Sequence, residues 1–287
     1  MGDIAAAAFV AHIPTLLIPE EIRRQWGDGE DTTLAEGLGR VRERLDAVGG
    51  IDTLVIIDTH WFTTTEHVFA GAEHFEGVYT SEEMPRAISD KPYDYPGAPE
   101  LAKVLHETAK EAGVRTTNAT SPALPVHYPT LILLDYLHRG EGVLSIGICQ
   151  TALAEDFLEF GRVLGEAIRR SGARAAILAA GGMSHRFYPL GEILDHLSYD
   201  PFHIITPEAR GMDEKIIGLW ERGDHATVID MYPQYRKHSP EGFFGHYLIM
   251  AGALGGRAWT ARGVKLSDYE NSVGTGQVHV WFELGDS

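Results

Sequence analysis

Histidines come directly after two of the buried strands that the sequence predicts. Residues 54–57 form an unbroken apolar run rich in β-branched side chains, and His60 follows it closely. Residues 4–10 form a second apolar run, which His12 follows. Such runs are typical of parallel strands covered on both faces, and open α/β sheets bind ligands at the carboxyl ends of their strands. We therefore expect both imidazoles at one edge of a sheet.

A third predicted strand ends in a glycine-rich turn. The small, apolar residues 173–180 are followed by Gly181-Gly182, and His185 comes three residues later. Imidazole titrates near neutral pH, so a histidine at such a place suits general acid–base chemistry. The sequence thus predicts three histidines at three strand ends.

Two imidazoles become a specific metal site when a carboxylate joins them. Two His and one carboxylate on one face of a metal leave the other positions open, as in the non-haem Fe(II) oxygenases. Two acids are candidates: Asp58, which lies beside His60, and Glu241, which follows Ser239-Pro240 at the predicted start of a helix. The helix dipole alone also favours a carboxylate in a first turn. The spacing does not decide between the two acids.

Strands and helices alternate along most of the chain. Residues 32–47 carry apolar side chains at spacings of three and four, which predicts an amphipathic helix between the first two strands. We expect a single α/β domain over residues 1–287, with a central, mostly parallel sheet flanked by helices. The predicted strands are 4–10, 53–57, 67–70, 114–117, 143–148, 173–180, 258–264 and 276–283, and the predicted helices are 32–47, 98–112, 130–138, 153–170, 208–222, 224–231 and 241–254.

Two stretches show no regular pattern. Residues 11–30 contain Pro14 and Pro19, and we expect a loop there. Residues 71–97 are rich in polar, aromatic and proline residues. A structureless segment of this length in a compact domain is usually functional. We therefore expect a functional or interface loop at about 72–97.

Composition excludes several classes of protein. The chain has 287 residues, of which 44% are hydrophobic, and a formal net charge of −17. An acidic chain without a basic patch is a poor partner for nucleic acid. No apolar run approaches the roughly 18 residues of a membrane span, and the N-terminus lacks the basic region of a signal peptide. The single cysteine, Cys149, excludes an intrachain disulfide, so we expect a cytoplasmic protein.

Five motifs that span nearly the whole chain carry a family resemblance. The motifs are His12-Ile13-Pro14, Asp58-Thr59-His60-Trp61, His74-Phe75-Glu76-Gly77-Val78-Tyr79-Thr80-Ser81, Ser184-His185-Arg186-Phe187 and Gly274-Thr275-Gly276-Gln277-Val278. In their residues and their order along the chain, these motifs resemble those of the class III extradiol ring-cleavage dioxygenases, the LigB-like family.

The resemblance implies a function and roles for particular residues. It implies that Fe(II) is held by His12, His60 and Glu241, and that O2 is the co-substrate. It implies that His185 is the acid–base residue. It also assigns His127 and Tyr128 to the neighbourhood of the substrate, where His127 could share the proton steps. We expect a homo-oligomer on the same ground.

The resemblance further implies a small aromatic substrate, a substituted catechol that is cleaved beside its hydroxyls to a muconic semialdehyde. We place 3,4-dihydroxyphenylacetate first, with Arg186 as a candidate partner for its acetate group. Gallate, protocatechuate, an aminophenol and a phenylpropionate catechol are alternatives with the same chemistry. A binding module of the same fold without oxygenase activity, and a zinc hydrolase with the same ligands, are alternatives from other classes.

Overall fold

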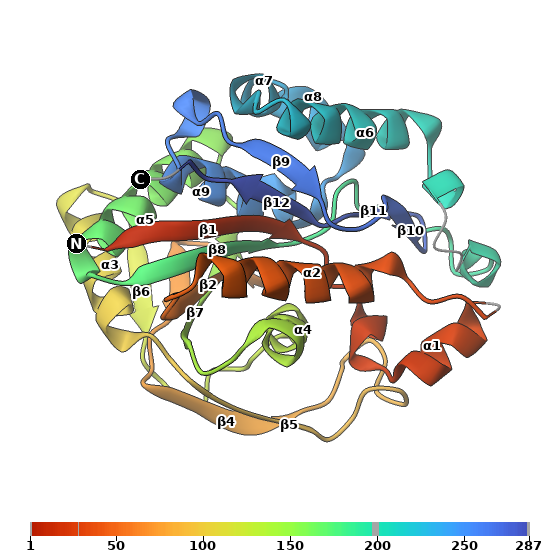
Figure 1. The fold of residues 1–287 in the computed structure, drawn as a ribbon, viewed down its shortest axis with the longest axis horizontal. Coiled ribbons are helices and arrows are strands. Elements are labelled where there is room, and N and C mark those ends of the chain that lie inside the picture. Colours follow the sequence, from red (N-terminus) through yellow and green to blue (C-terminus); the bar gives the residue numbers. More distant parts are fainter. Residues whose placement is uncertain (1, 28, 197–200, 286–287) are drawn as a thin grey trace.

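The computed structural model describes residues 2–27, 29–196 and 201–285, and an eight-stranded sheet forms the centre of this described part (Figure 1). Strands β7, β2, β8 and β1 are mutually parallel, and β12 and β9 continue the sheet in antiparallel pairing. This confirms the predicted α/β fold with a mostly parallel central sheet. From edge to edge the strands are β6 (Thr116–Ala119), β3 (His67–Ala70), β7 (Gly142–Cys149), β2 (Thr53–Thr63), β8 (Arg174–Ala180), β1 (Asp3–Val10), β12 (Val280–Glu283) and β9 (Arg262–Lys265).

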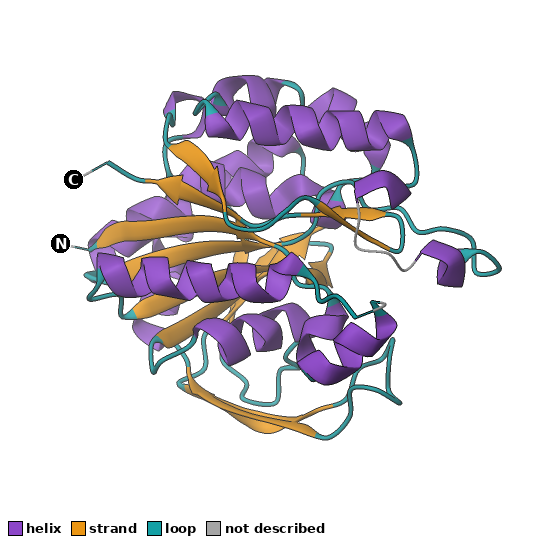
Figure 2. Ribbon diagram, turned by 45° about the vertical axis from the view of Figure 1, so that its right-hand side comes forward, coloured by secondary structure: helices purple, strands orange, loops and turns teal. Residues whose placement is uncertain are grey.

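Helices cover both faces of the sheet, as Figures 1 and 2 show. On one face lie α2 (Thr33–Val48) and α4 (Tyr128–Leu137); on the other lie α3 (Pro99–Glu111), α5 (Ala154–Ser171) and α9 (Gly245–Ala253). Helix α5 buries an apolar stripe at helical spacing that includes Phe157, Leu164 and Ile168. In the described part of the chain, no helix combines the length and the apolar character needed to cross a membrane.

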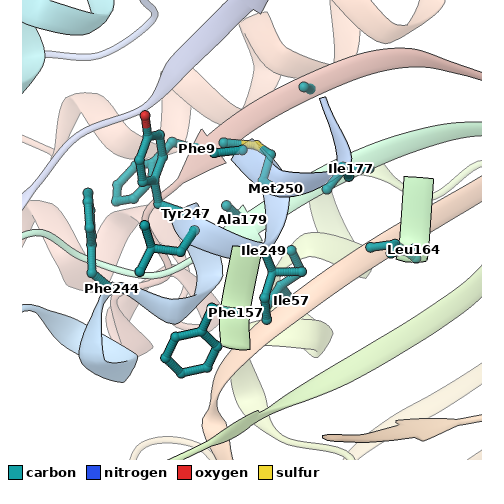
Figure 3. Close-up of a cluster of buried hydrophobic side chains, with 14 of the residues drawn as sticks. Phe9, Ile57, Phe157, Leu164, Ile177, Ala179, Phe244, Tyr247, Ile249 and Met250 are labelled. Atoms are coloured by element: carbon teal, nitrogen blue, oxygen red, sulfur yellow. The ribbon is translucent and has the colours of Figure 1, made fainter. Parts of the chain in front are cut away.

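The core is divided by the sheet into two layers. Alternate residues of one strand enter opposite layers, because successive side chains of a strand point to opposite faces. Phe9 and Ile57 pack toward α5 and α9, whereas Val10 and Ile56 pack toward α2 and α4. Figure 3 shows part of the first layer, in which Phe9, Phe157 and the residues of α9 meet. This double burial explains why the strands are continuous apolar runs.

The carboxyl ends of β1, β8 and β2 lie at the same level. Ala180, the last residue of β8, pairs with Val10 on one side and with Asp58 on the other. Strand β2 runs on to Thr63, but its register with β7 shifts between Asp58 and Phe62. Such a bulge re-aims side chains. Strand β8 lies between β1 and β2, so the two histidine-bearing strands flank it.

The prediction that residues 11–30 form a loop was wrong. A 3-10 turn (Pro14–Leu17) and helix α1 (Glu20–Trp26) occupy this stretch. Buried Arg23 donates to the carbonyl of Ile18 and to the carboxylate of Asp31, which closes the segment on itself. These contacts are tertiary, so the proline spacing alone did not reveal the helix.

The prediction of a structureless segment at 71–97 was also wrong. It contains an antiparallel hairpin of β4 (His74–Tyr79) and β5 (Lys91–Pro96). Phe75 and Tyr95 pair across the hairpin and are buried against the α4 side of the sheet, whereas Val78 points to solvent. The alternation of apolar and polar residues in β4 was the signal for a half-buried strand.

The C-terminal third differs from the prediction in its details. The helix predicted over 241–254 begins as a distorted 3-10 turn (Glu241–Phe244), and regular helix starts at Gly245. The strand predicted over 276–283 divides into β11 (Thr275–Gln277) and β12. The predicted helices 208–222 and 224–231 are α6 (Pro207–Glu221) and α7 (His225–Asp230). Helix α8 (Tyr232–Tyr235) and strand β10 (Glu270–Ser272) have no predicted counterpart.

Candidate metal centre

Two imidazoles and one carboxylate converge at the carboxyl edge of the sheet. Nε2 of His12, just beyond β1, and Nε2 of His60, in the bulged part of β2, each lie 3.0 Å from Oε1 of Glu241. The three ligand atoms lie within 4.8 Å of one another. His12 and Glu241 are buried, and His60 is partly exposed. Two strand ends and the turn that begins at Glu241 thus meet at one edge of the sheet.

The carboxylate of Glu241 is fixed on both oxygens. The hydroxyl of Thr59 donates to Oε1 over 2.8 Å, and the backbone N–H of Gly182 donates to Oε2. A Cβ at Gly182 would lie 2.9 Å from Oε2, so a glycine is needed where the carboxylate approaches the backbone. The glycine-rich turn after β8 therefore serves as part of the cradle for Glu241.

The turn that presents Glu241 is left-handed. Gly242, Phe243 and Phe244 have φ values of 52°, 56° and 60°. This conformation is easy for glycine and costly for other residues. The turn is held by neighbours: the N–H of Glu241 donates to the carbonyl of Met183, and Phe244 is fully buried.

The second candidate acid, Asp58, is not part of this cluster of ligand atoms. It is fully buried, and one of its oxygens accepts the backbone N–H of His60 at 2.9 Å. The other accepts the hydroxyl of Thr130 at 2.7 Å and its N–H at 3.2 Å. Asp58 therefore fixes the backbone that carries His60 and ties it to α4. The geometry favours Glu241 over Asp58 as the carboxylate of the centre.

His185, on the turn after β8, also reaches the centre. Its Nδ1 lies 4.0 Å from Oε2 of Glu241, whereas His12 and His60 contact Oε1. The backbone N–H of His185 donates to the carbonyl of Ser239, so the turn is joined to the segment that precedes Glu241. A base at this place can exchange a proton with a group held beside Glu241.

The other three predicted site residues differ in their distance from the centre. Tyr128, at the start of α4, places its hydroxyl 2.7 Å from Nε2 of His60. His127, the residue before it, stacks on Trp61 with ring centroids 6.5 Å apart. Arg186 donates to the carbonyl of Lys237 at 2.5 Å. Tyr128 therefore belongs to the cluster, whereas the guanidinium of Arg186 braces the chain before Glu241.

The charges of the centre are strongly coupled. Burial alone would raise the pKa of Glu241, but the imidazoles of His12 and His185 outweigh it and hold that pKa well below its usual range. Burial alone would lower the pKa of His60, but the hydrogen bond to Glu241 outweighs burial, so the pKa of His60 is raised. Burial lowers the pKa of His185. Burial and the charge of Glu241 raise the pKa of Tyr128 well above 10, so its phenol stays protonated.

A further carboxylate acts on the centre from the segment between β4 and β5. Glu83 interacts electrostatically with His60, His185 and Tyr128. The segment that was predicted as a loop thus contributes negative charge near the site. No local pattern in the sequence indicates this approach, since the hairpin that delivers it was not predicted.

Sequence reasoning missed the groups that hold the ligands in place. Thr59 stands inside one of the motifs quoted above, and Gly182 lies in the glycine-rich turn after residues 173–180, so their neighbourhood, though not their role, was visible. His279 gave no such signal: its Nδ1 accepts the N–H of Ala11 at 3.1 Å, next to His12, and its Nε2 lies 3.0 Å from the carbonyl of Leu34. Since a carbonyl only accepts, the proton of this buried imidazole sits on Nε2.

The donor set fits a divalent transition metal. Two imidazole nitrogens and one carboxylate oxygen, close together and largely buried, are the facial set used for non-haem iron. The carboxylate stays ionised because its pKa is low, and ligands must be deprotonated to bind a metal. The other close His–carboxylate group in the described part of the chain, His74 with Glu76 and Asp94, is exposed on the hairpin.

Comparison with known proteins agrees with this donor set. Residues 6–283 match the family described as the catalytic LigB subunit of aromatic ring-opening dioxygenase. The chain belongs to the LigB family. Dioxygenases of the LigB family use a non-haem metal and O2, so this member is an oxidoreductase of the ring-opening, extradiol type.

Two curated relatives match this LigB-family chain over nearly its whole length. The 3,4-dihydroxyphenylacetate 2,3-dioxygenase of Escherichia coli is 31% identical over 271 residues, which cover 91% of this chain and 95% of that enzyme. The 2-aminophenol 1,6-dioxygenase beta subunit of a Pseudomonas species is 26% identical over 300 residues, which cover 99% of this chain and 95% of that subunit.

A solved structure shares the fold. The uncharacterized protein JW3007 from Escherichia coli K12 aligns with a TM-score of 0.60 over 97% of this chain and 99% of that one. Its sequence is 17% identical, so it supports the architecture alone.

Proposed function

We propose that this LigB-family protein is an Fe(II)-dependent extradiol dioxygenase that inserts both atoms of O2 into a substituted catechol and releases a muconic semialdehyde. One observation carries the proposal: Nε2 of His12 and of His60 each lie 3.0 Å from the same oxygen of Glu241. This arrangement is costly for a fold unless a cation joins the three groups, because a buried and a partly exposed imidazole converge on one buried carboxylate.

The proposed ligands are His12, His60 and Glu241. When bound, Fe(II) would supply open positions for the catechol oxygens and O2 and would carry electron density between them. The protein's own contribution is to fix this set: Thr59 and Gly182 hold Glu241, Asp58 holds the backbone of His60, and His279 holds the backbone beside His12.

The proposed acid–base residue is His185. Because burial lowers its pKa, the imidazole is neutral near pH 7 and can accept a proton from a catechol hydroxyl. It can return that proton to an oxygen of the product as the ring opens. Tyr128, whose phenol stays protonated and lies beside His60, would donate a hydrogen bond to a substrate oxygen. His127 stacks on Trp61, and its part in catalysis stays a prediction.

The first candidate substrate is 3,4-dihydroxyphenylacetate. The support is the 31% identity with the E. coli enzyme that bears this substrate in its name. The proposed partner of the acetate is Arg186. Its guanidinium donates to the carbonyl of Lys237, so the side chain would have to turn in order to bind the acetate.

The second candidate is an aminophenol. The 26% identity with the aminophenol dioxygenase subunit supports it, and so does Glu83. A carboxylate near the site disfavours an anionic ring substituent and tolerates a neutral or positively charged one.

Steady-state O2 uptake with the anaerobically Fe(II)-loaded protein separates these candidates. The panel would hold 3,4-dihydroxyphenylacetate, 2-aminophenol, protocatechuate and gallate, each in wild type and in Glu83→Gln. We expect the highest kcat/KM for 3,4-dihydroxyphenylacetate, and a larger gain in Glu83→Gln for carboxylate-bearing substrates than for 2-aminophenol. A higher kcat/KM for 2-aminophenol would replace the first candidate by the second.

The quaternary structure and location of the chain are also proposals. We propose a homo-oligomer in which the β4–β5 hairpin contributes to the interface, in the cytoplasm. The exposed, apolar Val78 on the outer face of the hairpin supports the first part. Sedimentation of wild type and of Val78→Asp tests it, since a charge at a subunit contact would lower the mass in solution.

A further inference from the structure

A buried carboxylate lies behind the turn that carries His185. Asp213, in the middle of α6, is fully buried, although α6 packs outside the central sheet. In the described part of the chain no lysine or arginine forms an ion pair with it. Placing an unpaired carboxylate in a core is costly, and such groups are kept where hydrogen bonds and a function compensate.

Asp213 accepts hydrogen bonds from three separate segments of the chain. The hydroxyl of Ser184 donates to Oδ2 at 2.6 Å, and the backbone N–H of Ser184 lies 3.1 and 3.2 Å from the two oxygens. The phenol of Tyr235 donates to Oδ1 at 2.8 Å, and that of Tyr269 donates to Oδ2 at 2.7 Å. Both oxygens are therefore fully used. Against these bonds, burial still raises the pKa of Asp213 to about 6.

A glycine in β11 makes room for the carboxylate of Asp213. A Cβ at Gly276 in β11 would lie 2.3 Å from Oδ2 of Asp213. The backbone of the same glycine brackets the turn: the N–H of Met183 donates to its carbonyl at 2.8 Å, and its own N–H donates to the carbonyl of Ser184 at 3.0 Å. The turn is thus clamped by β11 along its backbone and by Asp213 at Ser184.

Ser184 stands directly before His185 in the chain. The N–H of His185 donates to the carbonyl of Ser239 at 3.1 Å, and a β-bridge joins Ser184 to Pro240. A rotation of the peptide at Ser184 would therefore change the direction of the imidazole that lies 4.0 Å from Glu241. The contacts of Asp213 with the N–H and the hydroxyl of Ser184 oppose that rotation.

We propose that Asp213 is a positioning residue for His185: it fixes Ser184 and thereby aims the imidazole at the space beside Glu241. The proposal deepens the proposed function, because it assumes that His185 moves the proton. Tyr235 and Tyr269 each donate one further hydrogen bond to Asp213, so the loss of either phenol leaves the contacts of Asp213 with Ser184 and with the other phenol in place.

The test compares Asp213→Asn with Tyr269→Phe in the full-length protein. Asparagine keeps the shape of the side chain but offers one acceptor oxygen to four donors. Tyr269→Phe removes one phenol donor and keeps the hydrogen bonds between Asp213 and Ser184. We expect kcat to fall about tenfold to hundredfold in Asp213→Asn, as a small misplacement of a reacting group does. Fe(II) affinity and KM should stay within about twofold, and Tyr269→Phe should keep most of kcat.

A double variant shows whether Asp213 acts through His185. In a His185→Gln background, Asp213→Asn should lower the residual kcat by less than about twofold, because the aimed group is gone. An equal fractional loss in both backgrounds would overturn the proposal. A loss of Fe(II) binding in Asp213→Asn would also overturn it, because Asp213 would then act on Glu241.

A readout without turnover separates this proposal from the proposed function. The ring 1H–13C resonance of His185, assigned through His185→Gln, should move in Asp213→Asn and stay in Tyr269→Phe, whether or not the protein consumes O2. An unmoved resonance would contradict the positioning role even if the enzyme is active. If Asp213→Asn does not fold, Ser184→Ala removes the hydroxyl alone, and it should move the same resonance and lower kcat.

Discussion

The two oxygens of Glu241 face different groups. Oε1 meets His12, His60 and the hydroxyl of Thr59, whereas Oε2 receives the N–H of Gly182 and faces His185. One carboxylate thus joins the proposed metal ligands to the proposed acid–base group. Its orientation decides both functions, so the groups that hold it should matter almost as much as the ligands.

The hydroxyl of Thr59 offers a direct test. Thr59→Val keeps the shape of the side chain and removes the hydrogen bond to Oε1. Loss of such a supporting contact weakens metal binding about tenfold to hundredfold. We expect an increase of this size in the Fe(II) dissociation constant, measured anaerobically by competition with a chelator. Thr53→Val, at the opposite end of β2, is the matched control and should leave the constant unchanged.

Tyr128 tests the substrate side. Its hydroxyl contacts the nitrogen of His60 that is the proposed ligand atom, so a bound metal frees the phenol for a substrate oxygen. A hydrogen bond contributes about 1 kcal/mol, which corresponds to roughly fivefold in affinity. We expect Tyr128→Phe to raise KM for the catechol by that factor without loss of Fe(II). Tyr136→Phe, on the same helix, should leave KM unchanged. A higher KM in Tyr136→Phe would mean that any change in α4 weakens substrate binding, and that the hydroxyl of Tyr128 has no specific role.

At the scale of elements, the site exists because three strands end at one level. The register of β8 with both β1 and β2 sets that level, and the bulge in β2 directs His60. The fourth part, the left-handed turn at 241–244, is irregular and lies far away in sequence. Strain at this turn is kept because the buried Phe244 and the bond from Glu241 to Met183 determine it.

Gly242→Ala tests this turn. At a φ of 52° alanine is strained, and its Cβ would lie 2.5 Å from Cγ2 of Thr59, the residue that holds Glu241. We expect a lower melting temperature together with a weaker Fe(II) affinity, because Glu241 must shift. Gly211→Ala in α6 meets nothing within 4 Å and should be neutral or stabilising by about 1 kcal/mol. Full Fe(II) affinity in Gly242→Ala would contradict the role of the turn.

The sequence predicted those parts of the fold that depend on local pattern. Buried strands and the amphipathic helices α2 and α5 follow from apolar runs and from spacings of three and four. The hairpin β4–β5 was missed because proline and polar residues mask its alternation, and Arg23 anchors α1 through contacts that only the folded chain makes. Spacing alone left Asp58 and Glu241 equivalent, since a contact across more than 200 residues has no local signature. The proximity of Glu83 was hidden for the same reason.

At the scale of the whole molecule, buried neutral histidines are a prominent feature. In the described part of the chain, burial lowers the pKa of His67, His225 and His279 to about 4, and the pKa of His246 to about 3. In each case the folded pKa lies below the unfolded value of 6.5. As the pH falls, the unfolded chain therefore binds protons at these histidines before the folded chain does. Their contribution to the free energy of unfolding is fully present above pH 6.5 and is lost toward pH 4.

We expect the free energy of unfolding to fall steeply between pH 6.5 and pH 4, because each of these histidines contributes up to about 1.4 kcal/mol per pH unit. Urea unfolding at several pH values measures the slope. His67→Phe is a suitable variant, since the ring of His67 stacks on Phe160 with centroids 4.1 Å apart and its replacement keeps the stack. In His67→Phe, the free energy of unfolding should depend less steeply on pH than in wild type, by the contribution of one histidine. The same slope in both proteins would show that His67 is not neutral in the folded chain.

The most direct test of the centre is O2 uptake by the protein after anaerobic loading with Fe(II). The loaded protein would be mixed with 3,4-dihydroxyphenylacetate in air-saturated buffer, with His60→Ala as the control. We expect one O2 consumed per catechol and a yellow semialdehyde product, with both the bound iron and the uptake lost in the variant. Uptake that persists undiminished in His60→Ala, or no uptake with any catechol or aminophenol, would contradict the assignment of His12, His60 and Glu241 as the metal centre of a ring-opening dioxygenase.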